Sequence, residues 1–263
     1  MRRRSWILLS SVVVIIALCV AFVIAATASA SPSSTDQHRR LPGLKQGTAL
    51  NWSGYAAETS LTSPASQVVT DVKGQWVVPK VTGSYFRRAY SSVWVGIDGY
   101  SSSTVEQIGT EQDWTGFGTS YYAWYEMYPA GMVNVGRVYP GDAMTAEVSS
   151  PSAGTFVLTI TDTTTAHHFT FTITKTLSSA LRSSAEWVAE APSSSSGVLP
   201  LANFGTMTFS GAQATINGHT GTISDASWQN DLITMVTSGG TVKAAPGSLT
   251  GGGTGFSVTW HHS

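Results

Sequence analysis

The sequence predicts an all-β protein, built from two packed antiparallel sheets or from a barrel. Charged residues make up only 11% of its 263 residues, too few for many helices with ion-paired outer faces. Ser, Thr, Gly, Val and aromatic residues dominate, which favours strands. About a dozen short runs with alternating apolar residues recur between turn-forming residues, as in sandwiches and barrels. Helix is therefore expected to be nearly absent.

Residues 1–30 predict an export signal. Three arginines, Arg2 to Arg4, precede an apolar run from Trp6 to Ala26, and Ala28-Ser29-Ala30 forms a small-residue cleavage site. The expected product is a secreted, extracellular protein. Because the run of 21 residues is long enough to span a bilayer, an uncleaved anchor through residues 6–26 is the alternative.

Cleavage after Ala30 would change both the cysteine content and the charge. The single cysteine, Cys19, lies in the signal segment, so the secreted protein would have no disulfide. It would carry 11 Lys and Arg against 15 Asp and Glu, a formal charge of −4. This balance argues against a nucleic acid partner. A sparsely charged, mildly acidic surface also suits low pH.

The rest of the chain divides into two parts. Residues 31–48 are polar and contain proline, which predicts a linker or a short propeptide. Residues 49–263 form the predicted β domain, because chains of this length with all-β patterns commonly make one domain. The Ser-rich stretch at Ser193–Gly197 and the Gly-rich stretch at Gly251–Gly255 are interpreted as loops inside it.

Alternation predicts the individual strands. Phe156, Leu158 and Ile160 share one face of a strand, as do Phe169, Phe171 and Ile173, and residues 162–165 join the two as a hairpin. The other strands are predicted at Gln67–Val72, Gly74–Val78, Ala89–Ile97, Tyr121–Tyr128, Ala143–Ser149, Ala185–Ala189, Met207–Phe209, Leu232–Val236 and Phe256–Trp260.

Familiar catalytic motifs are missing from the sequence. It contains no HExxH, CxxC, GxGxxG or GxSxG, so zinc, dinucleotide and elbow-serine chemistry lack support. The pairs His167-His168 and His261-His262 consist of neighbours that point to opposite faces of a strand, so neither pair forms a chelate alone. We therefore expect no metal and no cofactor. No serine lies in a recognisable nucleophile context.

Four segments place polar residues among large apolar ones, which is costly in a simple core and common in a binding cleft. They are Val93-Trp94-Val95-Gly96-Ile97-Asp98-Gly99, Val105-Glu106-Gln107-Ile108-Gly109-Thr110, Ala123-Trp124-Tyr125-Glu126-Met127-Tyr128-Pro129 and Ala185-Glu186-Trp187-Val188-Ala189-Glu190-Ala191-Pro192.

In their order and spacing these four segments resemble the glutamic peptidases, or eqolisins. The resemblance runs from the Asn51–Tyr55 segment to Phe209, and more weakly through Trp228 and Met235. It implies a sandwich of two large antiparallel sheets, similar to concanavalin and jelly-roll folds, and hydrolysis of peptide bonds without a cofactor. It also implies that Gln107 and Glu190 are the catalytic pair. Further cleft residues implied by position are Trp94, Asp98, Asp113, Trp124, Glu126 and Tyr128.

The chemistry of the pair agrees with this role. A carboxylate at Glu190 can take a proton from an attacking water and return it to the leaving amine. The Gln107 amide can donate to the developing oxyanion, and it does not titrate in acid. A histidine base would be protonated at low pH, so a glutamate base predicts an acid optimum.

Other interpretations of the same residues remain open. Glu186, Val188 and Glu190 share one strand face, opposite Trp187 and Ala189, so Glu190 could be a solvent-exposed strand residue. Asp98 before a glycine is ordinary turn chemistry. Four tryptophans are expected in the core rather than in subsites: Trp52, Trp76, Trp187 and Trp228.

Two rival functions use the same fold. Glu126 and Glu190 could be the paired carboxylates of a glycosidase, with tryptophans stacked on sugar rings. A lectin-like module without catalysis is the second rival. Gln107 distinguishes the peptidase, because a glycosidase does not need it. The lack of cysteines outside the signal fits a bacterial-type relative, and we expect a monomer that acts on protein or peptide substrates in an open cleft.

Overall fold

The structure is a computed structural model that describes residues 37–43 and 47–263. The predicted signal at residues 1–30, including the possible anchor at residues 6–26, lies outside the described residues, as does part of the predicted linker. Among the described residues, no helix is long and apolar enough to cross a membrane. The single helical element in this part of the chain is a 3-10 turn at Gly251–Gly253, which agrees with the strand-rich prediction.

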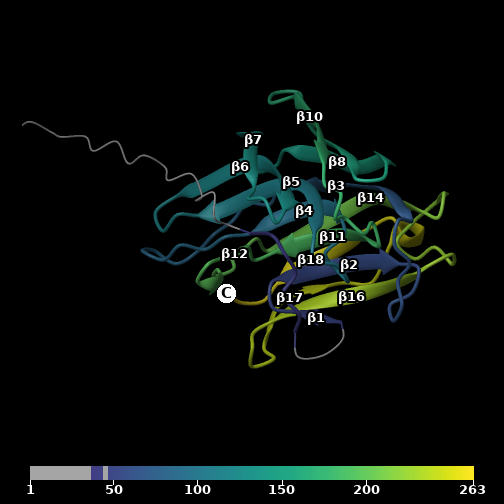
Figure 1. Ribbon diagram of the computed structural model, residues 1–263. Coiled ribbons are helices and arrows are strands. Elements are labelled where there is room, and N and C mark those ends of the chain that lie inside the picture. Colours follow the sequence, from purple (N-terminus) through teal and green to yellow (C-terminus); the bar gives the residue numbers. More distant parts are fainter. Residues whose placement is uncertain (1–36, 44–46) are drawn as a thin grey trace, which may run out of the picture. The chain divides into compact units, whose positions relative to one another are not determined.

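The strands follow one hydrogen-bonded path that folds into two layers, and every pairing along it is antiparallel (Figure 1). The first layer runs in the order β10 (Phe169–Thr176), β9 (Thr155–Asp162), β8 (Ala143–Ser152), β3 (Val69–Val77), β14 (Thr206–Ile216), β18 (Phe256–Trp260), β17 (Val242–Pro246) and β16 (Gln229–Val236). From β16 the path continues through the second layer as β2 (Trp52–Glu58), β11 (Ser184–Glu190), β4 (Ser92–Ile97), β5 (Val105–Trp114), β6 (Thr119–Tyr128) and β7 (Val133–Arg137).

Four short strands complete the described sheets. β1 (Thr48–Ala49) pairs in parallel with β16, and β15 (His219–Gly221) pairs with β14. β12 (Ser193–Ser194) and β13 (Gly197–Val198) form a small separate hairpin, where the sequence predicted only a loop.

The main core lies between the two layers. Trp187 on β11 reaches across to β3, where its indole N–H donates to the Lys73 carbonyl at 2.8 Å. A Cβ at Gly74 would lie 3.1 Å from both Trp187 and Val95, so a glycine lets the layers approach closely here. Trp76 from the first layer donates to Thr110 on β5 at 3.0 Å. Trp76 and Trp187 are therefore core residues, as predicted.

A second apolar cluster lies on the opposite face of the second layer. It includes Trp52, Trp94, Trp124 and Val188, each of which is at most 1% exposed, whereas their strand neighbours belong to the core between the layers. The predicted alternation of Val188 and Glu190 against Trp187 and Ala189 is thus confirmed for the apolar members. Trp52 is buried as predicted, but it lies on this second face.

Strand boundaries differ from the prediction where alternation is interrupted. The two predicted strands at Gln67–Val72 and Gly74–Val78 are one strand, β3, because Lys73 continues the ladder with Glu147. Polar residues such as Gln213 and Thr215 extend β14 to eleven residues, far beyond the predicted Met207–Phe209. Backbone pairing, which a polar residue serves as well as an apolar one, sets these limits.

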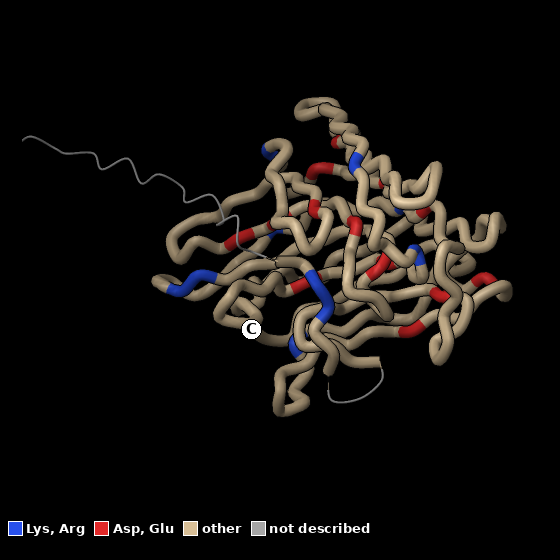
Figure 2. Tube along the Cα trace, viewed as in Figure 1, with Lys and Arg blue, Asp and Glu red and all other residues tan. Residues whose placement is uncertain are grey.

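Charges are sparse along the whole described trace. Figure 2 shows isolated blue and red positions separated by long uncharged stretches. The ion pairs found among the described residues all involve histidine, at His38, His167 and His219. Stability of this part of the chain therefore depends on the core and the sheet ladders.

Candidate active site

Glu190 is the last residue of β11 and its side chain is fully buried on the second-cluster face. The Trp94 indole N–H donates to Glu190 Oε2 at 2.8 Å, and the Asn51 amide donates to Glu190 Oε1 at 2.9 Å. Burial raises the pKa of Glu190 well above its usual range, and the hydrogen bonds from Trp94 and Asn51 oppose this effect. Glu190 is therefore a buried carboxyl group rather than an exposed strand residue.

Gln107 lies on β5, where it is paired with Gly96 on one side and Glu126 on the other. Its Nε2 donates to Glu126 Oε2 at 2.7 Å and to the backbone carbonyl of His38 at 2.9 Å. Its Oε1 is buried and has no hydrogen-bond partner among the described residues. The Gln107 amide thus already holds a peptide carbonyl.

His38 brings the two predicted catalytic residues into one site. Its Nδ1 lies 3.3 Å from Glu190 Oε2, while its carbonyl accepts the Gln107 bond. Its imidazole stacks on Trp124, with ring centres 4.1 Å apart and planes 11° apart. Gln107 and Glu190 therefore contact the same residue, one through its backbone and the other through its side chain.

A glycine separates the two indoles beside the site. Trp94, Gly109 and Trp124 lie side by side on β4, β5 and β6. A Cβ at Gly109 would lie 2.3 Å from the Val93 carbonyl oxygen and 2.5 Å from Trp94 Cβ. Only glycine leaves Trp94 in the position from which it donates to Glu190.

Glu126 lies beside His38, and Tyr128 lies beside Arg39. Glu126 Oε2 accepts from the His38 backbone N–H at 3.2 Å. Burial raises the pKa of Glu126 to about 7, helped by the charge of Glu190 and opposed by that of His38. The Arg39 guanidinium lies 6.0 Å from the Tyr128 ring centre.

Asp98 occupies a structural position. Its carboxylate accepts from the backbone N–H groups of Arg182 at 2.7 Å and Ser183 at 2.9 Å, and from the Ser183 hydroxyl at 3.0 Å. It also adopts a left-handed φ of 70° at the end of β4. These bonds hold the start of β11 against the turn after β4, so Asp98 acts on the site through the backbone.

Asp113 lies at the far end of β5, two residues beyond Glu111 on the same face. Burial raises the pKa of Glu111 well above its usual range, and the charge of Asp113 raises it further. Glu111 accepts a hydrogen bond from Ser92, and its Oε2 lies 3.9 Å from His38 Nε2. Asp113 is therefore connected to the site through Glu111.

Sequence analysis did not identify Asn51, Ser92, Glu111 or His38 as site residues. Glu111 was detectable in principle, because it lies four residues after Gln107 on the same strand face. Asn51 begins the first segment of the resemblance. His38 carried no signal, because it lies in a polar segment that alternation does not describe.

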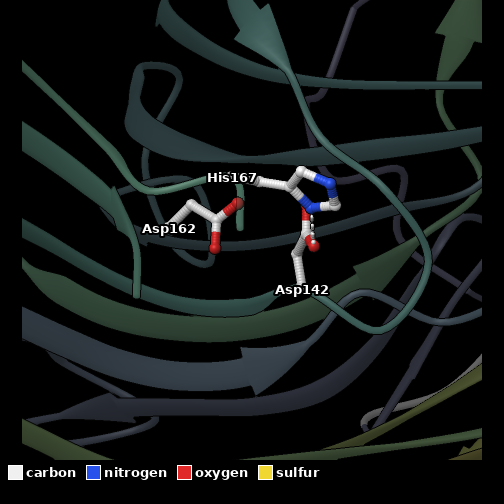
Figure 3. A group of neighbouring side chains, drawn as sticks. All are labelled: Asp142, Asp162 and His167. Carbon is white, nitrogen blue, oxygen red and sulfur yellow. Dashed lines mark hydrogen bonds and ion pairs between the residues drawn. The ribbon is translucent and has the colours of Figure 1, made fainter. Parts of the chain in front are cut away.

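A second group of titratable side chains lies in the first layer (Figure 3). Ligand atoms of Asp142, Asp162 and His167 lie within 4.8 Å of one another. His167 Nδ1 is 2.8 Å from Asp142 Oδ1, so His167 pairs with this carboxylate. The other Asp142 oxygen accepts from the Tyr139 backbone N–H at 2.7 Å. This ion pair joins the turn before β8 to the β9–β10 connection.

Comparisons with known proteins agree with this fold. The family model described as the Peptidase A4 family matches residues 50–260. Aspergillopepsin-2 from Aspergillus niger is 31% identical over 179 residues, which cover 60% of this chain and 64% of that protein. The match thus spans less than two thirds of that relative.

Solved structures show the same fold. A structure of scytalido-glutamic peptidase with a transition state analog inhibitor superposes with a TM-score of 0.65 and 24% identity, covering 80% of this chain and 98% of that one. Aspergilloglutamic peptidase from Aspergillus niger gives a TM-score of 0.57 and 29% identity, covering 66% of this chain and 99% of that one. The predicted antiparallel sandwich is confirmed.

Proposed function

Because the chain belongs to the Peptidase A4 family, we propose that it is an acid-acting glutamic endopeptidase with Glu190 and Gln107 as its catalytic pair. The observation that carries this proposal is the arrangement around His38. One peptide carbonyl lies 2.9 Å from Gln107 Nε2, and a group of the same residue lies 3.3 Å from Glu190 Oε2. A substrate placed in the same way would present its carbonyl to Gln107 and would lie next to Glu190.

Glu190 would act first as the general base. It takes a proton from a water molecule while the water oxygen bonds to the carbonyl carbon of the substrate. The two electrons of the carbonyl π bond move to its oxygen, which becomes negatively charged. Asn51 and Trp94 keep the Glu190 carboxylate oriented, because each donates to a different oxygen.

Gln107 would stabilise the negative oxygen with the same N–H that now holds the His38 carbonyl. When the intermediate collapses, the C–N bond breaks and Glu190 returns its proton to the leaving nitrogen. The products are a carboxylic acid and an amine. Glu126 fixes the Gln107 amide, since its Oε2 accepts the second Nε2 hydrogen at 2.7 Å.

The expected acid optimum depends on the water content of the site. Burial is the largest cause of the raised pKa of Glu190, and His38 lies against its carboxyl group, with Nδ1 3.3 Å from Oε2. A substrate-ready cleft without residues 37–43 is open to water, so the pKa of Glu190 there is expected to be lower. Glu190 can then ionise in mildly acidic solution while a histidine base could not act.

The remaining expectations belong to the same proposal. The substrates are proteins or peptides in extended form, and no metal or other cofactor takes part. An export signal at residues 1–30 would place the enzyme outside the cell. We also expect the enzyme to be a monomer. The cysteine-free sequence after Cys19 supports a bacterial-type member of the family.

The test is hydrolysis of a denatured protein by the exported form between about pH 2 and pH 8. Glu190→Gln and Gln107→Ala are each expected to lower kcat/KM by roughly three orders of magnitude or more. Glu147→Gln and Gln75→Ala are the matched controls, because both side chains are exposed on the first layer. Circular dichroism must show that all four variants are folded.

Three outcomes would overturn the proposal. The first is a folded enzyme that cuts no protein at any pH either with or without residues 37–43, in which case glycan hydrolysis and glycan binding are assayed. The second is full activity in either catalytic variant. Inhibition by a metal chelator or by a serine-reactive reagent would assign the hydrolysis to another mechanism.

A further inference from the structure

Residues 37–43 cross the predicted active site as an extended segment. Gln37 pairs with Ser193 through two backbone hydrogen bonds, at 2.7 Å and 2.9 Å. The Asn51 side chain donates to the Arg39 carbonyl at 2.7 Å and accepts from the Leu41 N–H at 2.8 Å. In Figure 1 this purple segment leads from the end of the grey trace towards β1. The segment is therefore held through its backbone on both sides of His38.

The contacts of His38 include both residues of the proposed catalytic pair. The His38 backbone binds Glu126 through its N–H and Gln107 through its carbonyl. Its side chain is 1% exposed and lies against Glu190 and Trp124. The segment thus presents a peptide carbonyl to the oxyanion donor as a substrate would.

The position of the imidazole distinguishes this segment from a substrate. Hydrolysis requires a water molecule on the Glu190 carboxylate, yet His38 Nδ1 lies 3.3 Å from Glu190 Oε2, and Glu190 Oε1 is bound to Asn51. The stacked Trp124 ring and Ser92 Oγ, 3.4 Å from Nδ1, keep the imidazole in that place. A carbonyl bound in this way has no water to attack it.

We propose that residues 37–43 are a built-in inhibitor of this enzyme, in which the His38 imidazole occupies the position of the catalytic water on Glu190. The inference rests on the proposed peptidase function, but it adds a regulator within this chain. It explains how the segment can lie across the catalytic pair without being cut there. It assigns a role to a part of the chain that sequence analysis interpreted as a linker or short propeptide.

The position of the segment can be tested without measuring hydrolysis. Diethyl pyrocarbonate modifies accessible neutral histidines, and the reaction is run at about pH 6. The exposed His168 is the internal reference, because it lies on the first layer away from Glu190. Peptide mapping should find His168 modified and His38 protected, and both modified after unfolding in urea. Equal modification of His38 and His168 in the folded protein would overturn the proposal.

The inhibitory role is tested by the initial rate of cleavage of a short quenched peptide. His38→Ala keeps the backbone contacts but frees Glu190 for water, so we expect a rate at least about 10-fold above that of the parent. Intact mass must show that residues 37–43 are still attached during this measurement. His168→Ala is the matched control and should match the parent.

The outcomes separate this proposal from the proposed function. Equal rates for the parent and His38→Ala, with the segment intact in both, would overturn the inhibitor while the peptidase stands. If no form cleaves any peptide, the peptidase function and the inhibitory role both fail. Protection of His38 from diethyl pyrocarbonate would then establish only that the segment covers this site.

Discussion

Both oxygens of Glu190 receive hydrogen bonds from neutral donors. Neutral donors stabilise the ionised carboxylate without adding a positive charge, and so oppose the effect of burial on its pKa. Trp94 is the largest of these lowering contributions. The tryptophan that the sequence placed in the cleft therefore has a specific chemical effect on the predicted base.

Trp94→Phe should move the acidic limb of the pH–activity profile upwards. The variant keeps most of the ring but loses the N–H that donates to Glu190 Oε2 at 2.8 Å. Loss of this bond removes a contribution that lowers the pKa of Glu190, so the carboxyl group should ionise at a higher pH. The measurement is kcat/KM against pH. Trp76→Phe is the control, because the Trp76 N–H donates to Thr110 in the core and not to Glu190. A Trp94→Phe profile whose acidic limb lies at the same pH as that of the parent would refute this effect.

Glu126→Gln should retain activity within several-fold in acid, whereas Glu126→Ala should lose roughly 10- to 100-fold. Burial raises the pKa of Glu126 to about 7, so the side chain is neutral at the expected working pH. A glutamine still offers an oxygen to Gln107 Nε2, and an alanine does not. The two variants are compared by kcat/KM at about pH 4. Complete loss in Glu126→Gln would instead indicate a catalytic carboxyl at this position, as in the glycosidase alternative.

At the level of elements, the site is made by strands that alternate between two environments. On β5, Gln107, Gly109 and Glu111 face the site, whereas Ile108 packs in the core between the layers. The neighbouring strands β4, β6 and β11 supply Trp94, Glu126 and Glu190 at adjacent ladder positions. A register shift of one residue would send every one of these side chains into the core.

Gly109→Ala should disturb both stability and activity. Its Cβ would lie 2.3 Å from the Val93 carbonyl oxygen and 2.5 Å from Trp94 Cβ, so β4 must shift. Such overpacking costs about 1–3 kcal/mol of the free energy of unfolding. The free energy of unfolding, measured with denaturant, and kcat/KM should both fall. Gly118→Ala is the control, because the atom nearest to its added Cβ, Thr115 Oγ1, would be 3.9 Å away. Equal behaviour of the two variants would contradict the steric argument.

At the scale of the whole described molecule, the interior holds many carboxyl groups. Burial raises the pKa of Glu58, Asp71 and Glu126 to about 7. It raises the pKa of Glu106, Glu111, Glu186 and Glu190 well above the usual range. Such groups are uncharged in acid, where their burial costs little. The interior is thus better suited to acid than to neutral solution.

The free energy of unfolding should therefore fall as pH rises from about 4 to about 7. In that range the folded protein holds protons that the unfolded chain releases, so deprotonation favours unfolding. Below about pH 4 both states are protonated and the penalty is absent. We expect a loss of at least about 2 kcal/mol, or a Tm lower by roughly 5 °C, by calorimetry. A Tm at pH 7 equal to or above that at pH 4 would contradict this.

Gln107 and Glu190 could be proposed as the catalytic pair from the sequence because they lie in segments whose order and composition are visible in the linear sequence. Glu126, Trp94 and Trp124 follow for the same reason. Asp98 shows the limit of this approach, because its neighbours in sequence do not reveal that its carboxylate binds the Arg182 and Ser183 backbone. Partners 84 and 85 residues away become visible only when the strands are assembled.

The sequence by itself determined the all-β class, most strands of the two layers and the family resemblance, since these depend on local alternation and on motifs. The tertiary structure alone decided what lies on the proposed catalytic pair. His38 meets Glu190 through its imidazole across 152 positions of the chain. It meets Gln107 across 69 positions through its backbone carbonyl, a group that every residue possesses. No residue type encodes such a contact, because it arises from where the folded chain places the backbone.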